Sequence, residues 1–228
     1  MLRRCIPVSL CPYQNSPFCR GLSEADKSVL CPACCTHSFK KRADAQESCR
    51  SVARELEPGI TYCTIILEGI QCTNSSQNPD SPKSYLLWQP GDIMNTECIF
   101  GDYDEISVHY HRNYLADGAY ALLPSSLLRR RFTENPQFAA FLFDNASHTH
   151  LRQTRFLLGT HLQNAKSALM FLLLFCQENK LSSLTHQDFA YLTGLNRTTV
   201  TKMLKKILIS EDLSIPLKDY ILSMYEEN

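Results

Sequence analysis

The chain of 228 residues lacks an excess of charge of either sign and lacks any long apolar run. Its 23 lysines and arginines balance 23 aspartates and glutamates, which excludes a polycation. Any contact with nucleic acid must therefore come from a local basic surface. The longest apolar run extends only from Ala168 to Cys176, well short of the roughly 20 residues that a membrane-spanning helix needs. We expect no membrane partner.

The sequence also lacks the signatures of secretion and of common enzyme chemistry. Prolines interrupt its first residues, and the uninterrupted apolar stretch of a signal peptide is missing, so we expect a cytoplasmic protein. No Ser/His/Asp set, carboxylate pair or phosphate-binding loop stands out. We therefore expect that the chain is not an enzyme.

Cysteine, in contrast, is abundant. The chain has 11 cysteines, and the reducing pool of the cytoplasm keeps thiols free, which disfavours a disulfide framework. The odd number also argues against complete pairing. Metal or redox chemistry therefore has to be considered.

The first half of the chain is rich in short stretches with strand propensity. Residues 61–67, 84–88 and 119–123 are predicted strands, and proline and glycine pairs such as Pro58-Gly59 and Pro90-Gly91 mark turns between them. This pattern is typical of a small antiparallel roll or barrel. Residues 22–30 are the exception, because Ser23 can cap a short helix there.

From Pro136 onward the hydrophobic period becomes helical. A long helix is predicted over residues 137–163, in which Leu151, Arg155, Leu158 and Leu162 have the spacing of a coiled-coil seam. Periodicity alone leaves two interpretations open, a seam that pairs two chains and a core helix packed on the roll. A second helix, residues 164–179, is apolar on most of its circumference and is predicted to be buried scaffold.

The segment 183–207 has the signals of two capped helices joined by a tight turn. Thr185 can cap the first helix with Asp188 three residues on, Gly194 can end it, and Asn196 can cap the second. Phe189, Ala190 and Leu195 are predicted to face Val200, Met203 and Leu204. This is the pattern of a helix-turn-helix.

The second of these helices carries a basic outer face. Between Leu181 and Lys206 there are four fixed positive charges against a single acid. Arginine can bond guanine bidentately and threonine can contact base edges, whereas lysines near the helix end suit phosphates. The predicted DNA contacts are Arg197, Thr198, Thr199, Thr201, Lys202, Lys205, Lys206, Thr185 and Gln187. The alternative is an ordinary helical hairpin with a solvated polar face.

A wing is predicted after the second helix. Residues 207–210 and 213–217 have the composition of two short strands around an acidic turn, and a final helix is predicted over 218–226. Together with the preceding pair of helices, this would make a winged helix-turn-helix.

The order of roll, long helix and winged helix-turn-helix resembles the CRP/FNR family of transcription regulators. The resemblance is strongest over 183–207, and it includes residues 90–93, Leu123-Pro124 and 134–136. It implies an α+β fold with a cupin-like, N-terminal antiparallel β-roll that acts as a sensor (1–143). It further implies a dimerisation helix (144–163) and a DNA-binding domain (164–228).

The resemblance also implies partners and ligands. A homodimer would read a palindromic operator in double-stranded DNA beside a promoter, with RNA polymerase as a further candidate partner. Arg197, Thr198 and Lys202 match positions that contact bases in the family, although most members have glutamate where this chain has Thr198. The Arg-Ser-Ala or Arg-Thr-Ala turn that holds a cyclic nucleotide is missing around Arg112, which argues against that ligand and leaves the effector unknown.

One branch of the family holds an iron–sulfur cluster on four cysteines. Three are closely spaced near the N-terminus, and the fourth lies in the strand just before the Leu-Pro pair, which is Leu123-Pro124 in this chain. Here the fourth position falls near Ala121 and the N-terminal spacing is wider, so inert thiols are the commoner outcome. The candidate metal ligands are Cys5, Cys11, Cys19, Cys31 and Cys34.

Two smaller metal hypotheses remain open. The pair Cys31 and Cys34 is a C-x-x-C that could bind zinc, with His37 as a third ligand, or form a redox disulfide. His109 and His111 could ligate a metal or haem, although such pairs are usually surface residues. The alternative function is accordingly a cysteine-rich metal- or redox-binding sensor that acts through protein contacts rather than DNA.

Overall fold

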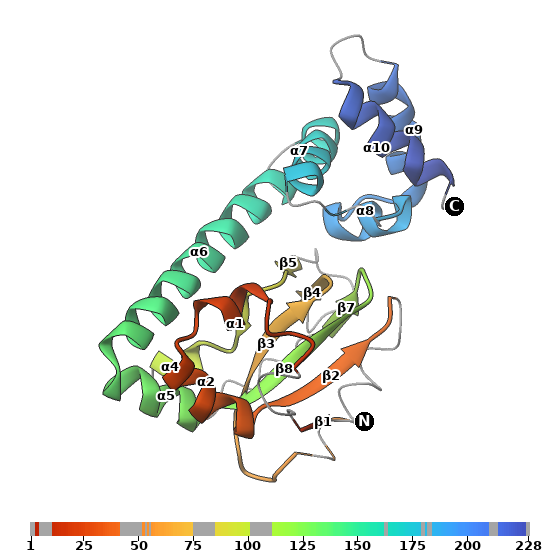
Figure 1. Cartoon of the computed structure of the whole chain (residues 1–228). Helices are drawn as coiled ribbons and strands as arrows, with labels where there is room; N and C mark the ends of the chain where they lie inside the picture. The colour runs from red at the N-terminus through yellow and green to blue at the C-terminus, as the bar shows by residue number, and fades with distance from the viewer. Residues whose placement is uncertain are drawn as a thin grey trace. The chain divides into compact units, whose positions relative to one another are not determined.

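The computed structural model describes residues 3–4, 11–41, 52, 54, 56–74, 85–100, 111–161, 164–178, 181, 184–209 and 214–226 (Figure 1). The chain divides into two compact units. One comprises Met1–Thr73 with Leu87–Arg152, and the other comprises Asn74–Leu86 with Gln153–Asn228. Among the described residues, no helix is both long enough and apolar enough to cross a membrane.

Antiparallel strands form the centre of the first unit. A five-stranded sheet has the order β1 (Arg3–Arg4), β2 (Cys35–Phe39), β8 (Gly118–Pro124), β3 (Tyr62–Glu68) and β6 (Ile93–Met94). A three-stranded sheet has the order β5 (Tyr85–Trp88), β4 (Gln71–Asn74) and β7 (His111–Tyr114). The strands predicted over 61–67, 84–88 and 119–123 are confirmed as β3, β5 and β8, as is the α+β class.

The two faces of β3 pack into two separate parts of the core. Cys63, Ile65 and Leu67 belong to one buried cluster, which also contains Phe18, Leu30 and Phe138. Ile66, between them, belongs to a second cluster with Tyr114 and Tyr120. This alternation is the two-residue period of a strand that is buried on both faces.

Short helices cover the first unit beside these strands. They are α1 (Pro17–Gly21), α2 (Glu24–Leu30), the 3₁₀ turn η2 (Cys31–Ala33), α4 (Glu97–Phe100) and α5 (Ser125–Glu134). Ser23 caps α2 as predicted, since its hydroxyl accepts the backbone N–H of Asp26. The sequence analysis did not identify α5.

The buried carboxylate of Asp26 ties α2 to α5. It forms an ion pair with Arg131 and accepts hydrogen bonds from Ser23 Oγ and, at 3.2 Å, from Asn135 Nδ2. Burial raises the pKa of Asp26, but the bonds to Ser23, Arg131 and Asn135 outweigh burial and lower the pKa below its usual value. The carboxylate is therefore held in its charged form.

A second buried carboxylate connects the turn before β6 to the long helix α6 (Pro136–His161). Asp92 pairs with Arg152 and accepts a hydrogen bond from Thr149 Oγ1 at 3.1 Å, while Asn145 Nδ2 donates to the carbonyl of Gly91 at 2.9 Å. Burial raises the pKa of Asp92 above its usual value, although the Arg152 guanidinium acts in the opposite direction.

Within the described residues, the second unit contains the end of α6 and four further helices. These are α7 (Ala165–Glu178), α8 (His186–Thr193), α9 (Arg197–Leu208) and α10 (Ile215–Glu226). The helices predicted over 137–163 and 164–179 and the helical pair within 183–207 are confirmed. Gly159 lets α6 approach α7 closely, because a Cβ at that position would lie 2.3 Å from the ring of Phe171.

The predicted wing strands are wrong wherever the structure describes them. Ile207 and Leu208 continue α9, and residues 215–217 begin α10, which starts earlier than the predicted Lys218. The reason is packing, since Ile207 is buried on the same face of α9 as Val200 and Leu204, at helical spacing.

Candidate nucleic-acid interface

The start of α8 is fixed by a complete capping box. The Thr185 hydroxyl accepts the backbone N–H of Asp188 at 3.3 Å, and the Asp188 carboxylate accepts the backbone N–H of Thr185 at 2.8 Å. Two donors that a helix start would leave unpaired are thereby satisfied. The capping expected from the sequence is confirmed at this position.

The turn between the helices depends on Gly194 and Asn196. Gly194 ends α8 in the left-handed region, at φ 70° and ψ 7°, a conformation that glycine adopts without steric cost. Asn196 begins α9, since its side-chain oxygen accepts the backbone N–H of Thr199 at 2.7 Å. These local signals set where α9 starts.

Packing between the helices fixes which face of α9 turns inward. Phe189, Ala190, Val200 and Leu204 are buried as predicted. Leu195 and Met203, which were also assigned to the inner face, are half-buried. Because the inner face of α9 is apolar, the polar and basic residues of this helix lie on its outer surface.

Most of the predicted DNA-contacting side chains lie on the surface. Those exposed are Arg197, Thr198, Lys202, Lys205, Lys206 and Gln187, and those half-buried are Thr199 and Thr201. Thr185 is the exception, because it is 3% exposed and its hydroxyl is used in the capping box. These bonds position the start of α8.

His186 is a member of this site that the sequence analysis missed. The residue is buried, and its Nδ1 lies 3.2 Å from the hydroxyl of Thr201 on α9. Burial lowers the pKa of His186, and the charges of Arg197 and Lys205 lower it further. A histidine just after a helix cap gives no sequence signal of a partner fifteen positions away, so only the fold reveals this contact.

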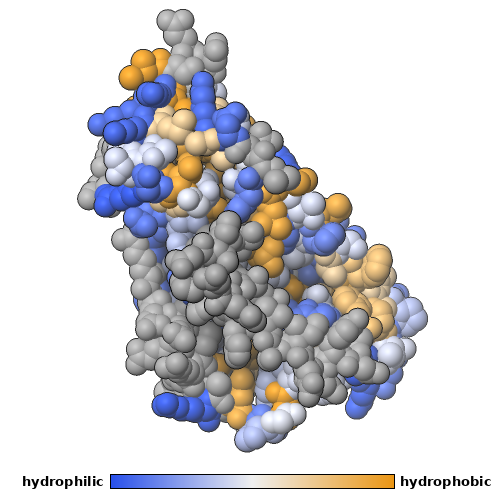
Figure 2. Space-filling model, turned by 180° about the vertical axis from the view of Figure 1, so that it is seen from behind, coloured by the Kyte–Doolittle hydropathy of each residue, from blue (hydrophilic) through white to orange (hydrophobic). Residues whose placement is uncertain are grey.

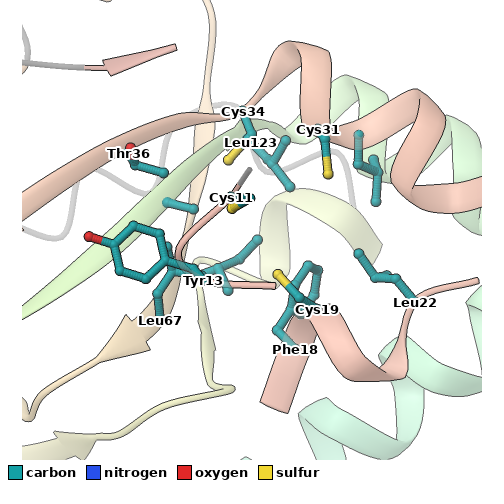
Figure 3. Close-up of a pocket in the computed structure, with 13 residues that line it drawn as sticks. Cys11, Tyr13, Phe18, Cys19, Leu22, Cys31, Cys34, Thr36, Leu67 and Leu123 are labelled. Atoms are coloured by element: carbon teal, nitrogen blue, oxygen red, sulfur yellow. The ribbon is translucent and has the colours of Figure 1, made fainter. Parts of the chain in front are cut away.

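Four of the five candidate cysteines come together in the first unit. Cys11, Cys19, Cys31 and Cys34 line one pocket of about 30 Å³ (Figure 3). Cys5 lies outside the described residues. In the part of the chain that the structure describes, no three His, Cys, Asp or Glu side chains are grouped to hold a metal ion. The described cysteines therefore do not fit the iron–sulfur or zinc ligand sets considered from the sequence.

The candidate histidines do not join these cysteines. The ring of His37 lies 5.2 Å from that of Tyr120, and the pocket is lined by the preceding residue, Thr36, instead. Successive residues of a strand point to opposite faces, which separates His37 from Cys31 and Cys34. His109 and the side chain of His111 lie outside what the structure describes.

Comparisons with known proteins bear on the fold. No family model matches the chain, and no curated protein matches it in sequence. A crystal structure described as a Crp/Fnr-family transcriptional regulator from Eubacterium rectale matches with a TM-score of 0.57 and 14% identity, over 92% of this chain and 98% of that one. A CRP-family transcriptional regulator from Thermus thermophilus matches with a TM-score of 0.55 and 15% identity, over 83% of this chain and 96% of that one.

A cyclic nucleotide-binding domain containing protein from Listeria monocytogenes is similar to the same degree. Its TM-score is 0.55, with 10% identity over 86% of each chain. At such identities the likeness concerns the fold. The roll, the long helix α6 and the α8–α9 pair accordingly give this chain the fold of the CRP/FNR transcription regulators, as the sequence resemblance predicted.

Proposed function

We propose that the chain is a sequence-specific, DNA-binding transcription regulator that acts as a homodimer. One observation carries the proposal: α9, capped at its start and packed on α8, exposes Arg197, Lys202, Lys205 and Lys206 and contains no acidic residue. In a helix-turn-helix, the start of the second helix contacts base edges in the major groove. The exposed cations of α9 suit that role.

The proposed contacts divide by position along α9. Arg197 and Thr198 lie at its start and Lys202 near its middle, and these three would contact bases, with Arg197 as a guanine reader. Lys205 and Lys206 lie at its end and suit phosphates, as does Thr199 in the first turn. Gln187 on α8 is a further exposed candidate, whereas Thr201 is half-buried beside His186.

The homodimer is proposed from α6. Leu151 and Leu158 are 66% and 49% exposed and lie one heptad apart, as in a coiled-coil seam. Leu162, the last seam residue predicted, lies outside the described residues. On the face of the molecule seen in Figure 2, hydrophobic residues, in orange, reach the surface between hydrophilic ones, in blue. Pairing of two α6 helices would bury Leu151 and Leu158.

We assign functions to segments as the sequence suggested. Residues 1–143 would be the sensor, 144–163 the dimerisation helix and 164–228 the DNA-binding domain. The signal would alter the spacing of two α9 helices, which must lie about 34 Å apart to enter successive major grooves. Contact with RNA polymerase at the promoter would follow from operator binding.

The test is selection of bound sequences from a random DNA pool, followed by affinity measurements at several salt concentrations. We expect a palindromic site and an affinity that falls steeply with salt, because phosphate contacts release counterions. Arg197→Ala should cost about 1–3 kcal/mol and relax preference at one base pair. The matched control is Arg130→Ala, at an exposed arginine of α5. This substitution should change neither the affinity for DNA nor the base preference. Unchanged base preference in Arg197→Ala would refute the role of α9.

A further inference from the structure

Four cysteines from three stretches of the sequence share one apolar pocket. Cys11 precedes α1, Cys19 lies in α1, Cys31 opens η2, and Cys34 follows η2. Their side chains point toward the same space in Figure 3. Apolar residues complete the wall, among them Leu22, Leu30, Ile65 and Leu123. A pocket of about 30 Å³ is large enough to admit at least one water molecule.

The backbone holds two of these cysteines at a separation that a disulfide can span. Cys31 and Cys34 are the first and fourth residues of a tight turn, in which the N–H of Cys34 donates to the carbonyl of Cys31 at 3.1 Å. Such a turn keeps its end Cα atoms within about 7 Å. Disulfides join Cα atoms roughly 4.4–6.8 Å apart. Because both side chains also line one pocket, they are directed to the same side of the turn.

The two thiols differ in access and in electrostatic surroundings. Cys31 is half-exposed, whereas Cys34 is buried. The ammonium of Lys27, whose side chain is only 18% exposed, is held by Glu24 at 2.8 Å. The backbone N–H of Cys31 donates to the carbonyl of Lys27, so the two residues lie one helical turn apart and on the same side of α2. Glu24 is the main cause that raises the pKa of Lys27, and Cys19 and Cys31 contribute to the same shift. A neighbouring cation favours the thiolate, which is the reactive form of cysteine.

We propose that Cys31 and Cys34 form a thiol-oxidation site for small hydroperoxides, with Cys31 as the attacking thiol and Cys34 as the resolving thiol. The Cys31 thiol first releases its proton to solvent. Its thiolate attacks one peroxide oxygen, so that an S–O bond forms and the O–O bond breaks, and the alkoxide or hydroxide that leaves takes up a proton from solvent to give alcohol or water. Cys34 then attacks the Cys31 sulfur, the S–S bond forms, and the hydroxyl leaves as water with the Cys34 proton. Two thiols lose two electrons, and one hydroperoxide is reduced.

The chain contains its own matched controls. Cys35 is adjacent to Cys34, but it packs against the other core cluster, pairs with Leu122 on β8, and does not line the pocket. Cys176 lies in the core of the second unit, where burial raises the pKa of its thiol to about 12. Neither cysteine should react at the rate of Cys31.

The experiment treats the reduced full-length chain with hydrogen peroxide and maps the products by peptide mass spectrometry. Wild type and Cys35→Ser should both lose two hydrogen atoms from the peptide that contains Cys31 and Cys34, and dithiothreitol should restore them. In Cys34→Ser, Cys31 should instead accumulate a sulfenic acid that dimedone traps. Lys27→Gln should slow the reaction several-fold, and Lys27→Arg should retain most of the rate.

Some results would overturn the proposal. One is a disulfide that disappears in Cys35→Ser and persists in Cys31→Ser. Another is a wild-type chain in which Cys31 is modified no faster than Cys176. A third is stoichiometric metal bound to Cys31 and Cys34 that prevents their oxidation. The readout is thiol chemistry in the first unit, so it is independent of whether α9 binds DNA.

Discussion

At the scale of single residues, the buried His186 predicts a dependence of stability on pH. Its pKa is lowered in the folded chain by burial, Arg197 and Lys205, whereas in the unfolded chain it lies near the ordinary value of about 6.5. Between these two values the unfolded state binds more protons, so stability rises with pH. The contribution of His186 is present above about pH 6.5 and is lost as the pH falls toward the folded pKa.

The measurement is thermal unfolding at about pH 7.5 and about pH 5.5. We expect His186→Asn to reduce the loss of stability between the two conditions. His148→Asn is the matched control, because His148 lies on the surface of α6 with its side chain 75% exposed. An equal effect of the two substitutions would show that His186 is not the titrating group.

The residues that define the helix-turn-helix could be read from the sequence because their signals are local. Thr185, Asp188, Gly194 and Asn196 each act within a few positions along the chain, through a cap or a backbone conformation. The buried state of Thr185 could not be read in this way. The same hydroxyl that makes a good cap is bonded to Asp188, and the residue is buried, which argues against the DNA contact expected of Thr185.

At the scale of elements, the missed helix α5 and the misassigned wing have the same cause. Pro124 precedes α5 without a side-chain cap, and the helix is stabilised by distant contacts, among them Arg131 with Asp26 and Arg129 with the carbonyl of Cys98. The short apolar runs at 207–210 and 213–217 suit strand and helix equally. In the described residues of these runs, tertiary packing favours the helical conformation. A single sequence carries no direct signal of that packing.

The ion pair between Asp92 and Arg152 predicts strong coupling between the turn before β6 and α6. Arg152→Met would leave the buried carboxylate without its charge partner, at a cost of about 3 kcal/mol in unfolding free energy. Asp92→Asn combined with Arg152→Met should recover much of this loss. Chemical denaturation of the two single variants and the double variant gives the coupling energy. Additive effects would mean that the pair contributes no coupling.

At the scale of the whole molecule, the exposed leucines of α6 predict an oligomer. Leu151→Glu should place a charge in the proposed seam, convert the dimer to a monomer and weaken operator binding by at least tenfold, since one α9 then acts alone. Light scattering after size-exclusion chromatography measures the mass. Leu222→Glu, at an exposed leucine of α10, is the control and should leave the mass unchanged. A monomeric wild type would contradict the prediction.

The convergence of cysteines is also a property of the whole molecule. The spacing of Cys5, Cys11 and Cys19 differs from that of the cluster-binding branch of the family. Spacing alone did not indicate that Cys11, Cys19, Cys31 and Cys34 line one pocket. Sequence separation determines neighbours only within one helix or strand, and here the neighbours belong to several elements.

The uneven distribution of charge has a kinetic consequence. Because positive and negative charges are equal in number over the chain, the field of a DNA duplex exerts little net pull on the molecule from afar. The cluster on α9 nevertheless experiences a torque in that field, within a Debye length of about 10 Å at moderate salt. If α9 binds DNA as proposed, this torque would rotate the molecule during the last stage of diffusion, and many encounters would begin with α9 already facing the grooves.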